Sequence, residues 1–325
     1  MAGSSNYPNG FPQGVTIKGV PVVVTNPGRV FWVSNATTLQ TGDIGGSNGN
    51  PGTAMKPFAS ILYAVSRCTA GRGDIVLVKP GHAETISSAA ILTLTVAGVA
   101  IVGLGAGSNR PTLTFTTANT ANIPVTAANI TVTNILHVAN FLNIASAYTA
   151  TGTATPTDLT IDNCEFRDNT SALNFVKTVS GNATANSMDG FTYSNNRVLG
   201  LATTAATQAV IIASATRRTS YLNNFVNYPV LNDTAALVDF GANNQLDLYM
   251  SGNRVVRPST STTGGSLFSG GSTGSTGYVV DNYSWHLDNT AALLAPTGTT
   301  LGFQNNYSMV TGAADKSGLI NPAAV

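Results

Sequence analysis

The densest group of acidic residues is the part of the chain whose residue types come nearest to a catalytic site. Asp158, Asp162, Glu165 and Asp168 fall within eleven positions, and the chain has 12 Asp but only 2 Glu. Glycoside hydrolysis uses two carboxylates at a set separation, so a hydrolase interpretation makes Asp162 and Glu165 the acid and the base or nucleophile. The alternative is a set of solvated turn residues, with Asp162 accepting hydrogen bonds from local backbone amides. We favour the alternative, because no second acidic cluster stands at matching positions of the repeat described below.

Histidine and cysteine form no catalytic or metal-binding arrangement in the sequence. His82, His137 and His286 lie far apart, and each is predicted to be a surface or turn histidine. Cys68 and Cys164 match no metal-ligand spacing and are predicted to be buried free thiols. We therefore assign no catalytic, cofactor-binding or metal-binding residue, and we expect no cofactor.

The composition excludes several classes of partner. Only 9% of the 325 residues are charged and the net charge is +1, which argues against nucleic-acid binding and against a polybasic membrane-surface protein. No apolar run reaches the roughly 18 residues of a membrane span, so no membrane partner is expected. The first ten residues lack the basic and apolar regions of a signal peptide, and none is expected. Hydrophobic residues make up 43%, enough for a large core.

A repeat organises the chain from residue 130 onward. Two apolar residues separated by a spacer are followed by a turn residue at Asn134, Asn163, Asn195, Asn223, Gly252, Asp281 and Asn305, with a mean spacing of 28.5 residues. The residue two before each turn is always apolar, and the residue after the last five turns is Asn196, Asn224, Asn253, Asn282 and Asn306. Matched columns at this period predict short strands stacked into a parallel β-solenoid.

The solenoid makes two further predictions. Stacked coils of about 28 residues would pile the apolar columns into one core and the asparagines into a hydrogen-bonded ladder. A β-sandwich is the main alternative, but it gives no reason for matched columns so far apart. Glu165, Arg197 and Arg254 share one column, which leaves a coil-to-coil ion pair as the simplest account of their charges. A pectate-type lyase would instead need calcium-binding carboxylates and a basic residue on one face.

The N-terminal third differs from the repeat. Apolar residues at 58, 61, 62 and 65 predict an amphipathic helix over 57–69, with Pro57 in its first turn, placed to cap the solenoid. Residues 1–41 are predicted to be an extended arm with strands at 20–24 and 30–33. The apolar residues of this arm must bury against its own solenoid or against a partner. The predicted domains are 1–41 (arm), 42–72 (linker and capping helix) and 73–325 (β-helix).

Two stretches carry a resemblance to known families. Residues 49–52, 56–61 and 73–81, which include Lys56-Pro57-Phe58 and Lys79-Pro80-Gly81, resemble the opening of pectate-lyase-like right-handed β-helix proteins. Residues 6–11 and 14–21 look like the start of tailed-phage virion proteins, and with 81–86 and 100–105 the likeness covers roughly the first third of the chain. The resemblance implies an all-β fold, a right-handed parallel β-helix, and a place in a phage particle as a homotrimer.

These features together predict a non-enzymatic virion structural protein. It would be a capsid decoration or cement protein, made in the host cytoplasm and bound to the major capsid protein on the head surface through its arm. The alternative is a tail-associated adhesin or tailspike that binds, or also cleaves, a host surface glycan, for which Tyr283, Trp285 and Tyr307 would supply aromatic surface. A carbohydrate-active enzyme outside a virion is a third possibility.

Overall fold

The structure is a computed structural model. It describes residues 15–17, 20–22, 28–37, 44–201, 207–228, 235–256, 266–269, 272–286, 300–310 and 318–320. Most of the predicted arm, including Phe11, and most of the C-terminal segment 311–325 lie outside these residues.

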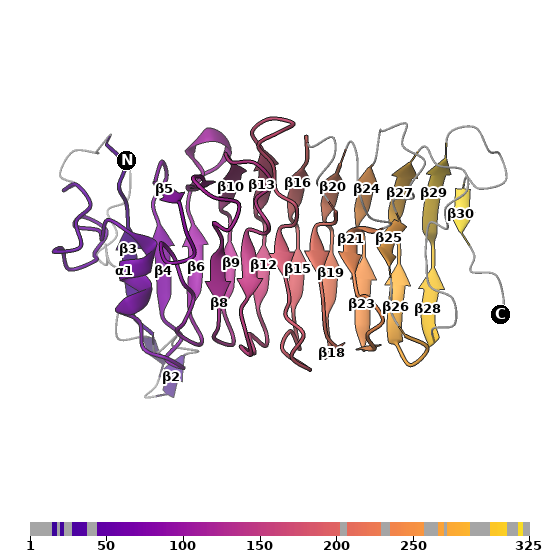
Figure 1. Cartoon of the computed structure of the whole chain (residues 1–325). Helices are drawn as coiled ribbons and strands as arrows, with labels where there is room; N and C mark the ends of the chain where they lie inside the picture. The colour runs from indigo at the N-terminus through magenta and orange to yellow at the C-terminus, as the bar shows by residue number, and fades with distance from the viewer. Residues whose placement is uncertain are drawn as a thin grey trace, which may run out of the picture.

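Three sheets form the stack, two of ten strands that run along its length and one of six strands between residues 123 and 269 (Figure 1). The first sheet contains β3 (Val30–Val33), β4 (Ile75–Val78), β6 (Ala100–Gly103), β9 (Thr131–Thr133), β12 (Thr160–Asp162), β15 (Thr192–Ser194), β19 (Ser220–Leu222), β23 (Leu248–Ser251), β26 (Thr276–Val280) and β28 (Thr300–Gln304). All neighbours in this sheet are parallel.

The second and third sheets contain the other strands of the coils. The second contains β5 (Ala83–Ile86), β7 (Thr112–Phe115), β10 (Leu136–Ala139), β13 (Glu165–Asp168), β16 (Arg197–Leu199), β20 (Phe225–Asn227), β24 (Arg254–Val256), β27 (Tyr283–His286), β29 (Asn306–Val310) and β30 (Gly318–Ile320). The third contains β8 (Ile123–Val125), β11 (Tyr148–Ala150), β14 (Val179–Ser180), β17 (Val210–Ile211), β21 (Ala235–Asp239) and β25 (Ser266–Ser269). Outside them lie the pairs β1 (Val15–Ile17) with β2 (Val20–Val22) and β18 (Thr216–Arg217) with β22 (Gln245–Leu246), and the 3₁₀ turn η1 (Gly107–Asn109).

The predicted parallel β-helix is therefore confirmed. The predicted turn residues all have left-handed backbone, from φ 48° at Asn163 to φ 67° at Gly252, the conformation that Asn, Asp and Gly tolerate best. The apolar column two residues earlier is buried from Val132 to Val279, and Phe303 packs against the same core. A mean period of 28.5 residues thus equals one turn of the solenoid.

A second column of left-handed residues marks the corner before the first sheet. It consists of Gly73, Gly98, Asn129, Asp158, Gly190, Arg218 and Asp247. Gly73 and Gly98 lie five residues before the last residue of β4 and of β6, and the other five lie five residues before the predicted turns from Asn134 to Gly252. The two columns of left-handed residues therefore stand at opposite ends of the first-sheet strands. Its mixed residue types hide this column in the sequence, whereas the asparagine-rich column is visible.

The predicted asparagine ladder forms inside the corner between the first and second sheets. The Oδ1 of Asn253 accepts from the backbone N–H of Asn224 at 3.1 Å and from its Nδ2 at 2.9 Å. The Nδ2 of Asn253 donates to the carbonyl of Tyr221 at 2.7 Å and to Asn282 Oδ1 at 2.9 Å. All five asparagines are buried, and the side-chain amides of Asn224, Asn253 and Asn282 each join three coils.

The predicted capping helix is shorter than the sequence pattern suggests. Helix α1 covers Ile61–Ser66, with Ser60 as its N-cap accepting the N–H of Tyr63 at 3.3 Å. Phe58 and Ile61 are buried at the N-terminal end of the core as expected, but Phe58 belongs to a bridge with Val33 rather than to the helix. The cap and the pairing of Phe58 fix the start of the helix four residues after Pro57.

The strand predicted at 30–33 lies in the solenoid. The sequence assigns it to the arm, whereas β3 pairs in parallel with β4 over four residues and forms the first strand of the first sheet. Phe31 and Val33 point into the core, which explains the alternating apolar pattern that made this segment visible.

Candidate functional site

The four acidic residues of the cluster do not form one site, because their carboxylates have different partners on different parts of the coil. Asp162 ends β12 on the first sheet and accepts hydrogen bonds from Ser194 Oγ at 2.6 Å and Asn195 Nδ2 at 2.8 Å in the next coil. The sequence predicts bonds to local amides, and that detail is wrong. Asp158 occupies a turn, with one carboxylate oxygen 3.6 Å from the guanidinium of Arg218.

Asp168 is the clearest departure from the solvated-turn prediction. Its side chain is buried and accepts the backbone N–H of Phe175 at 2.9 Å and of Leu201 at 2.8 Å. A buried carboxylate held by backbone donors orders the loops around it, and it is closed to a substrate.

Glu165 is the one member of the cluster that lies among arginines on an outer face. Arg167 Nε donates to it at 3.0 Å, and Arg110 lies 3.8 Å from its other oxygen. The predicted partner, Arg197, is its register neighbour in β16, but the ion pairs in the described residues are with Arg110 and Arg167. The pairing expected from the sequence is therefore corrected.

Arg197 and Arg254 belong to a continuous column on the outside of the second sheet. The register of β13, β16, β20, β24, β27 and β29 aligns Glu165, Arg197, Phe225, Arg254, Tyr283 and Tyr307. We call these six residues the outer column. Their alternation with buried neighbours such as Val198, Val226 and Val255 fixes their outward direction.

Planar groups in the outer column lie against one another. The Tyr283 and Tyr307 rings are stacked, 5.3 Å apart with planes 9° from parallel, and remain 51% and 42% exposed. The guanidiniums of Arg197 and Arg254 lie 5.9 and 5.6 Å from the centre of the Phe225 ring, within cation–π range. Within the described residues, no carboxylate is ion-paired with either arginine. The result is a rail of ring faces and unpaired positive charge along the axis of the stack.

His137 lies inside the core, so the prediction of a surface or turn histidine is wrong for it. Its ring stacks on Phe166 at 4.5 Å, its Nε2 lies 2.7 Å from the Tyr148 hydroxyl, and its Nδ1 lies 3.3 Å from the Glu165 carbonyl. A carbonyl only accepts, so Nδ1 carries the proton and Nε2 accepts from the hydroxyl. Complete burial lowers the pKa of His137 to about 3, and the ring is neutral.

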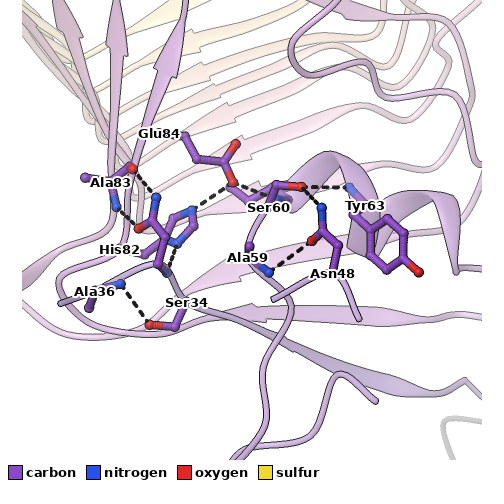
Figure 2. Close-up of polar contacts among 11 residues, drawn as sticks. Ser34, Ala36, Asn48, Ala59, Ser60, Tyr63, His82, Ala83 and Glu84 are labelled. Carbon is purple, nitrogen blue, oxygen red and sulfur yellow. Dashed lines mark hydrogen bonds and ion pairs between the residues drawn. The ribbon is translucent and has the colours of Figure 1, made fainter. Parts of the chain in front are cut away.

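His82 is also buried, and Figure 2 shows it in a polar network at the N-terminal end of the stack. Its Nδ1 accepts the Asn35 backbone N–H at 3.0 Å, and its Nε2 donates to Glu84 Oε1 at 2.9 Å. The same oxygen of Glu84 accepts the N–H of Ile61, the first residue of α1. Ser60 lies beside them, but both nitrogens of His82 are already engaged. The network therefore fastens the capping helix to the first coils and leaves no free base for a serine nucleophile.

The remaining predicted residues are placed as follows. Cys164 is buried and Cys68 half-buried, both free, and burial raises the pKa of each thiol to about 12. His286 lies at the end of β27, but its side chain is outside the described residues, whereas Trp285 is half-buried on the outer face. Across the described ranges there is no group of three or more His, Cys, Asp or Glu suited to a metal ion, and no helix long and apolar enough to cross a membrane.

The outer column could have been found by counting from the turns. Each member lies two residues after one of the predicted turn residues, which run from Asn163 to Asn305. By residue type, Arg197 and Arg254 fall in one column, whereas Phe225 carries no signal of its own and Tyr283 and Tyr307 stand as separate aromatic residues. In the second-sheet strands, a side chain two residues after the turn points outward, whereas one three residues after the turn points into the core.

Comparison with known proteins bears on the fold. No family model and no curated protein matches the sequence. Among solved structures, the pectate lyase Pel9A aligns over 88% of this chain and 78% of its own, with 11% identity and a TM-score of 0.53. The coils have the pectate lyase fold. A rhamnogalacturonan lyase aligns over 91% and 86% with 12% identity and a TM-score of 0.44, too low to add to the argument.

The comparison corrects the prediction that the chain is not an enzyme. That prediction is wrong as it stands, because the pectate-lyase-like fold on which the virion assignment relied is the fold of a polysaccharide lyase. At 11% identity the likeness establishes the fold alone, so no catalytic residue of the lyase is carried over. The phage particle, the capsid protein partner and the homotrimer stay predictions.

Proposed function

We propose that this β-helix binds an acidic polysaccharide along the outer column, with the glycan chain parallel to the axis of the stack. The observation that carries the proposal is the unbroken series of outward planar groups from Arg197 to Tyr307, of which Arg197, Arg254, Tyr283 and Tyr307 are exposed and Phe225 is half-buried beneath the two guanidiniums. Tyrosine rings offer apolar faces to sugar rings, and a guanidinium forms two parallel hydrogen bonds with a carboxylate. A polymer with a carboxylate on its sugars uses both kinds of group.

The charge distribution supports an acidic ligand. Arg110, Arg167, Arg197 and Arg254 lie on or beside the outer column, whereas Glu165, which is paired with Arg110 and Arg167, is the one carboxylate among its six residues. The similarity in fold to a pectate lyase is compatible with this ligand class. Binding is also the first step of any cleavage.

Binding is tested by calorimetry or affinity electrophoresis with polygalacturonate, its methyl-esterified form and neutral dextran. We expect binding to polygalacturonate only, weakened about 10- to 100-fold by Arg254→Gln, in line with the ~1.5–3 kcal/mol of hydrogen bonds to charged groups. Tyr283→Ala should weaken binding about 3- to 10-fold, from the ~0.5–1.5 kcal/mol of aromatic contacts.

The matched control is Arg217→Gln, which removes the same charge from an exposed side chain in β18, outside the second sheet. It should leave affinity within about two-fold. Equal losses in Arg254→Gln and Arg217→Gln would show charge-driven binding without a site, and no binding of the acidic polymer would refute the proposal. Ultraviolet absorbance and reducing ends, recorded in the same samples, report eliminative or hydrolytic cleavage.

A further inference from the structure

The outward side of the first sheet carries one column of residues that changes from small and polar to aromatic. The register of β9, β12, β15, β19, β23, β26 and β28 aligns Thr131, Thr160, Thr192, Ser220, Tyr249, Tyr278 and Gly302. Buried neighbours such as Met250 and Val279 fix the outward direction of this column. The strands β23, β26 and β28 lie side by side toward the C-terminal end of the stack (Figure 1).

Tyr249 and Tyr278 are the large exposed side chains of this column, with 43% and 64% of their surface accessible. The four preceding coils form the same strand with threonine or serine at this position. The stack therefore does not need an aromatic ring here. An exposed tyrosine ring combines an apolar face with a hydroxyl, which suits a ligand that is partly apolar and partly hydrated.

The glycine that follows the two tyrosines gives the Tyr278 ring room to lie over the sheet. A Cβ at Gly302 would lie 3.0 Å from Cδ1 and 3.3 Å from Cε1 of Tyr278, so the ring extends over the next coil. It therefore leans away from Tyr249, its register neighbour one coil earlier. With strands about 4.8 Å apart, the two rings are placed to contact successive units of a chain that runs along the axis.

The surroundings of the two rings disfavour a negatively charged ligand. No residue of β19, β23, β26 or β28 is charged, and their other outward residues are Leu222, Ser251, Thr276, Val280, Thr300 and Gln304. The turns that bound these strands include the carboxylates of Asp247 and Asp281. The guanidinium of Arg218, at another of these turns, lies 3.6 Å from Asp158. Two carboxylates beside an uncharged surface would repel an anion, in contrast to the arginines of the outer column.

We propose that Tyr249 and Tyr278 form a second carbohydrate site, which binds a neutral and extended glycan chain. Sugars with equatorial hydroxyls and β-1,4 linkages present flat apolar faces in a row, and such faces stack on tyrosine rings. Ser251 and Gln304 carry neutral hydrogen-bonding groups on the same side of the sheet, suited to sugar hydroxyls. This site goes beyond the proposed function, because it lies on a different sheet from the outer column and takes a ligand without charge.

Calorimetric titration of the full-length protein with cellohexaose tests this site. Dextran is the control ligand, because its flexible α-1,6 linkages do not hold sugar faces in a row. We expect cellohexaose to bind, and Tyr249→Ala and Tyr278→Ala each to weaken it about 3- to 10-fold, the range expected of an aromatic contact. Gly302→Val keeps both tyrosines but displaces the Tyr278 ring, so it should also weaken binding by about 3-fold or more.

The matched control variant is Leu142→Ala, which removes an apolar side chain that is 53% exposed and lies outside the first sheet. It should keep the affinity within about two-fold of the parent, as expected for a distant site. Circular dichroism verifies the fold of each variant.

Four results would overturn the proposal. Absence of binding up to about 10 mM cellohexaose would mean that the tyrosines form no carbohydrate site. Equal losses in Leu142→Ala and Tyr278→Ala would place the ligand elsewhere. Binding of dextran as tight as that of cellohexaose would show that the site does not select an extended chain. Displacement of cellohexaose by polygalacturonate would mean that both ligands share the outer column.

Discussion

Replacing Asn253 by Ala is expected to lower the unfolding free energy by on the order of 3–5 kcal/mol. The substitution removes the acceptor of both the Asn224 N–H and its Nδ2, and the donor to Tyr221 and Asn282. Each buried polar group left without a partner costs about 1–3 kcal/mol, and the backbone N–H of Asn224 and the carbonyl of Tyr221 are two such groups. In urea unfolding, the midpoint should fall well below that of the parent.

Asn253→Asp sharpens the test of the ladder. Aspartate keeps the acceptor oxygen and nearly the same shape, but it cannot donate to Tyr221 or Asn282, and it places a charge in a buried site. We expect it to be at least as damaging as alanine at pH 7. Gln304→Ala, an exposed change on β28, is the control and should stay within about 0.5 kcal/mol. A small effect at Asn253 would mean that the ladder contributes little to stability.

The second large effect is a loss of stability in acid caused by His137. Its pKa is about 3 in the folded protein and about 6.5 when unfolded, so the unfolded state binds the extra proton as the pH falls. The neutral ring contributes fully to the free energy of unfolding above pH ~6.5. This contribution is lost as the pH falls from about 6.5 to about 3, at roughly 1.4 kcal/mol per pH unit.

His137→Phe isolates this term from the other titrating groups. Phenylalanine can occupy the stack between Phe115 and Phe166, while the Tyr148 hydroxyl loses its partner at every pH. As the pH falls from 6 to 4, the parent should therefore lose unfolding free energy that the variant keeps, so the parent's value falls steadily relative to the variant's. Two curves that stay parallel over this range would contradict the assignment of a neutral, buried His137.

The repeat was predictable because each coil places residues of one small set, Asn, Asp or Gly, at its turn and Asn at the ladder position. The turn column runs from Asn134 to Asn305 and the ladder from Asn196 to Asn306. The first follows from the need for left-handed backbone and the second from the need for hydrogen-bonded amides in a buried corner. The second turn column was not predictable from residue type, since Gly73, Asp158 and Arg218 share only a backbone conformation.

Residue type alone does not show whether His137, Asp168 and Glu165 are buried or exposed, because that depends on their distance from the preceding turn. His137 lies three positions after the turn residue Asn134, and Asp168 lies five positions after the turn residue Asn163. In both cases the odd distance places the side chain inside the coil. Glu165 lies two positions after its turn and points outward. Which arginine reaches Glu165 depends on side-chain length and local twist, and only the structure shows that Arg110 and Arg167 do so.

The most direct test of the proposed function is the dependence of affinity on ligand length, measured by calorimetry with oligogalacturonates of two to eight sugars. Five strands of the second sheet carry the outer column from Arg197 to Tyr307, a rail of about 20 Å at the usual strand spacing. Affinity should rise with each added sugar until the ligand covers the rail and then level off, with the rise shortened in Arg254→Gln and Tyr283→Ala. Affinity that is already maximal for a disaccharide would contradict binding along the axis of the stack.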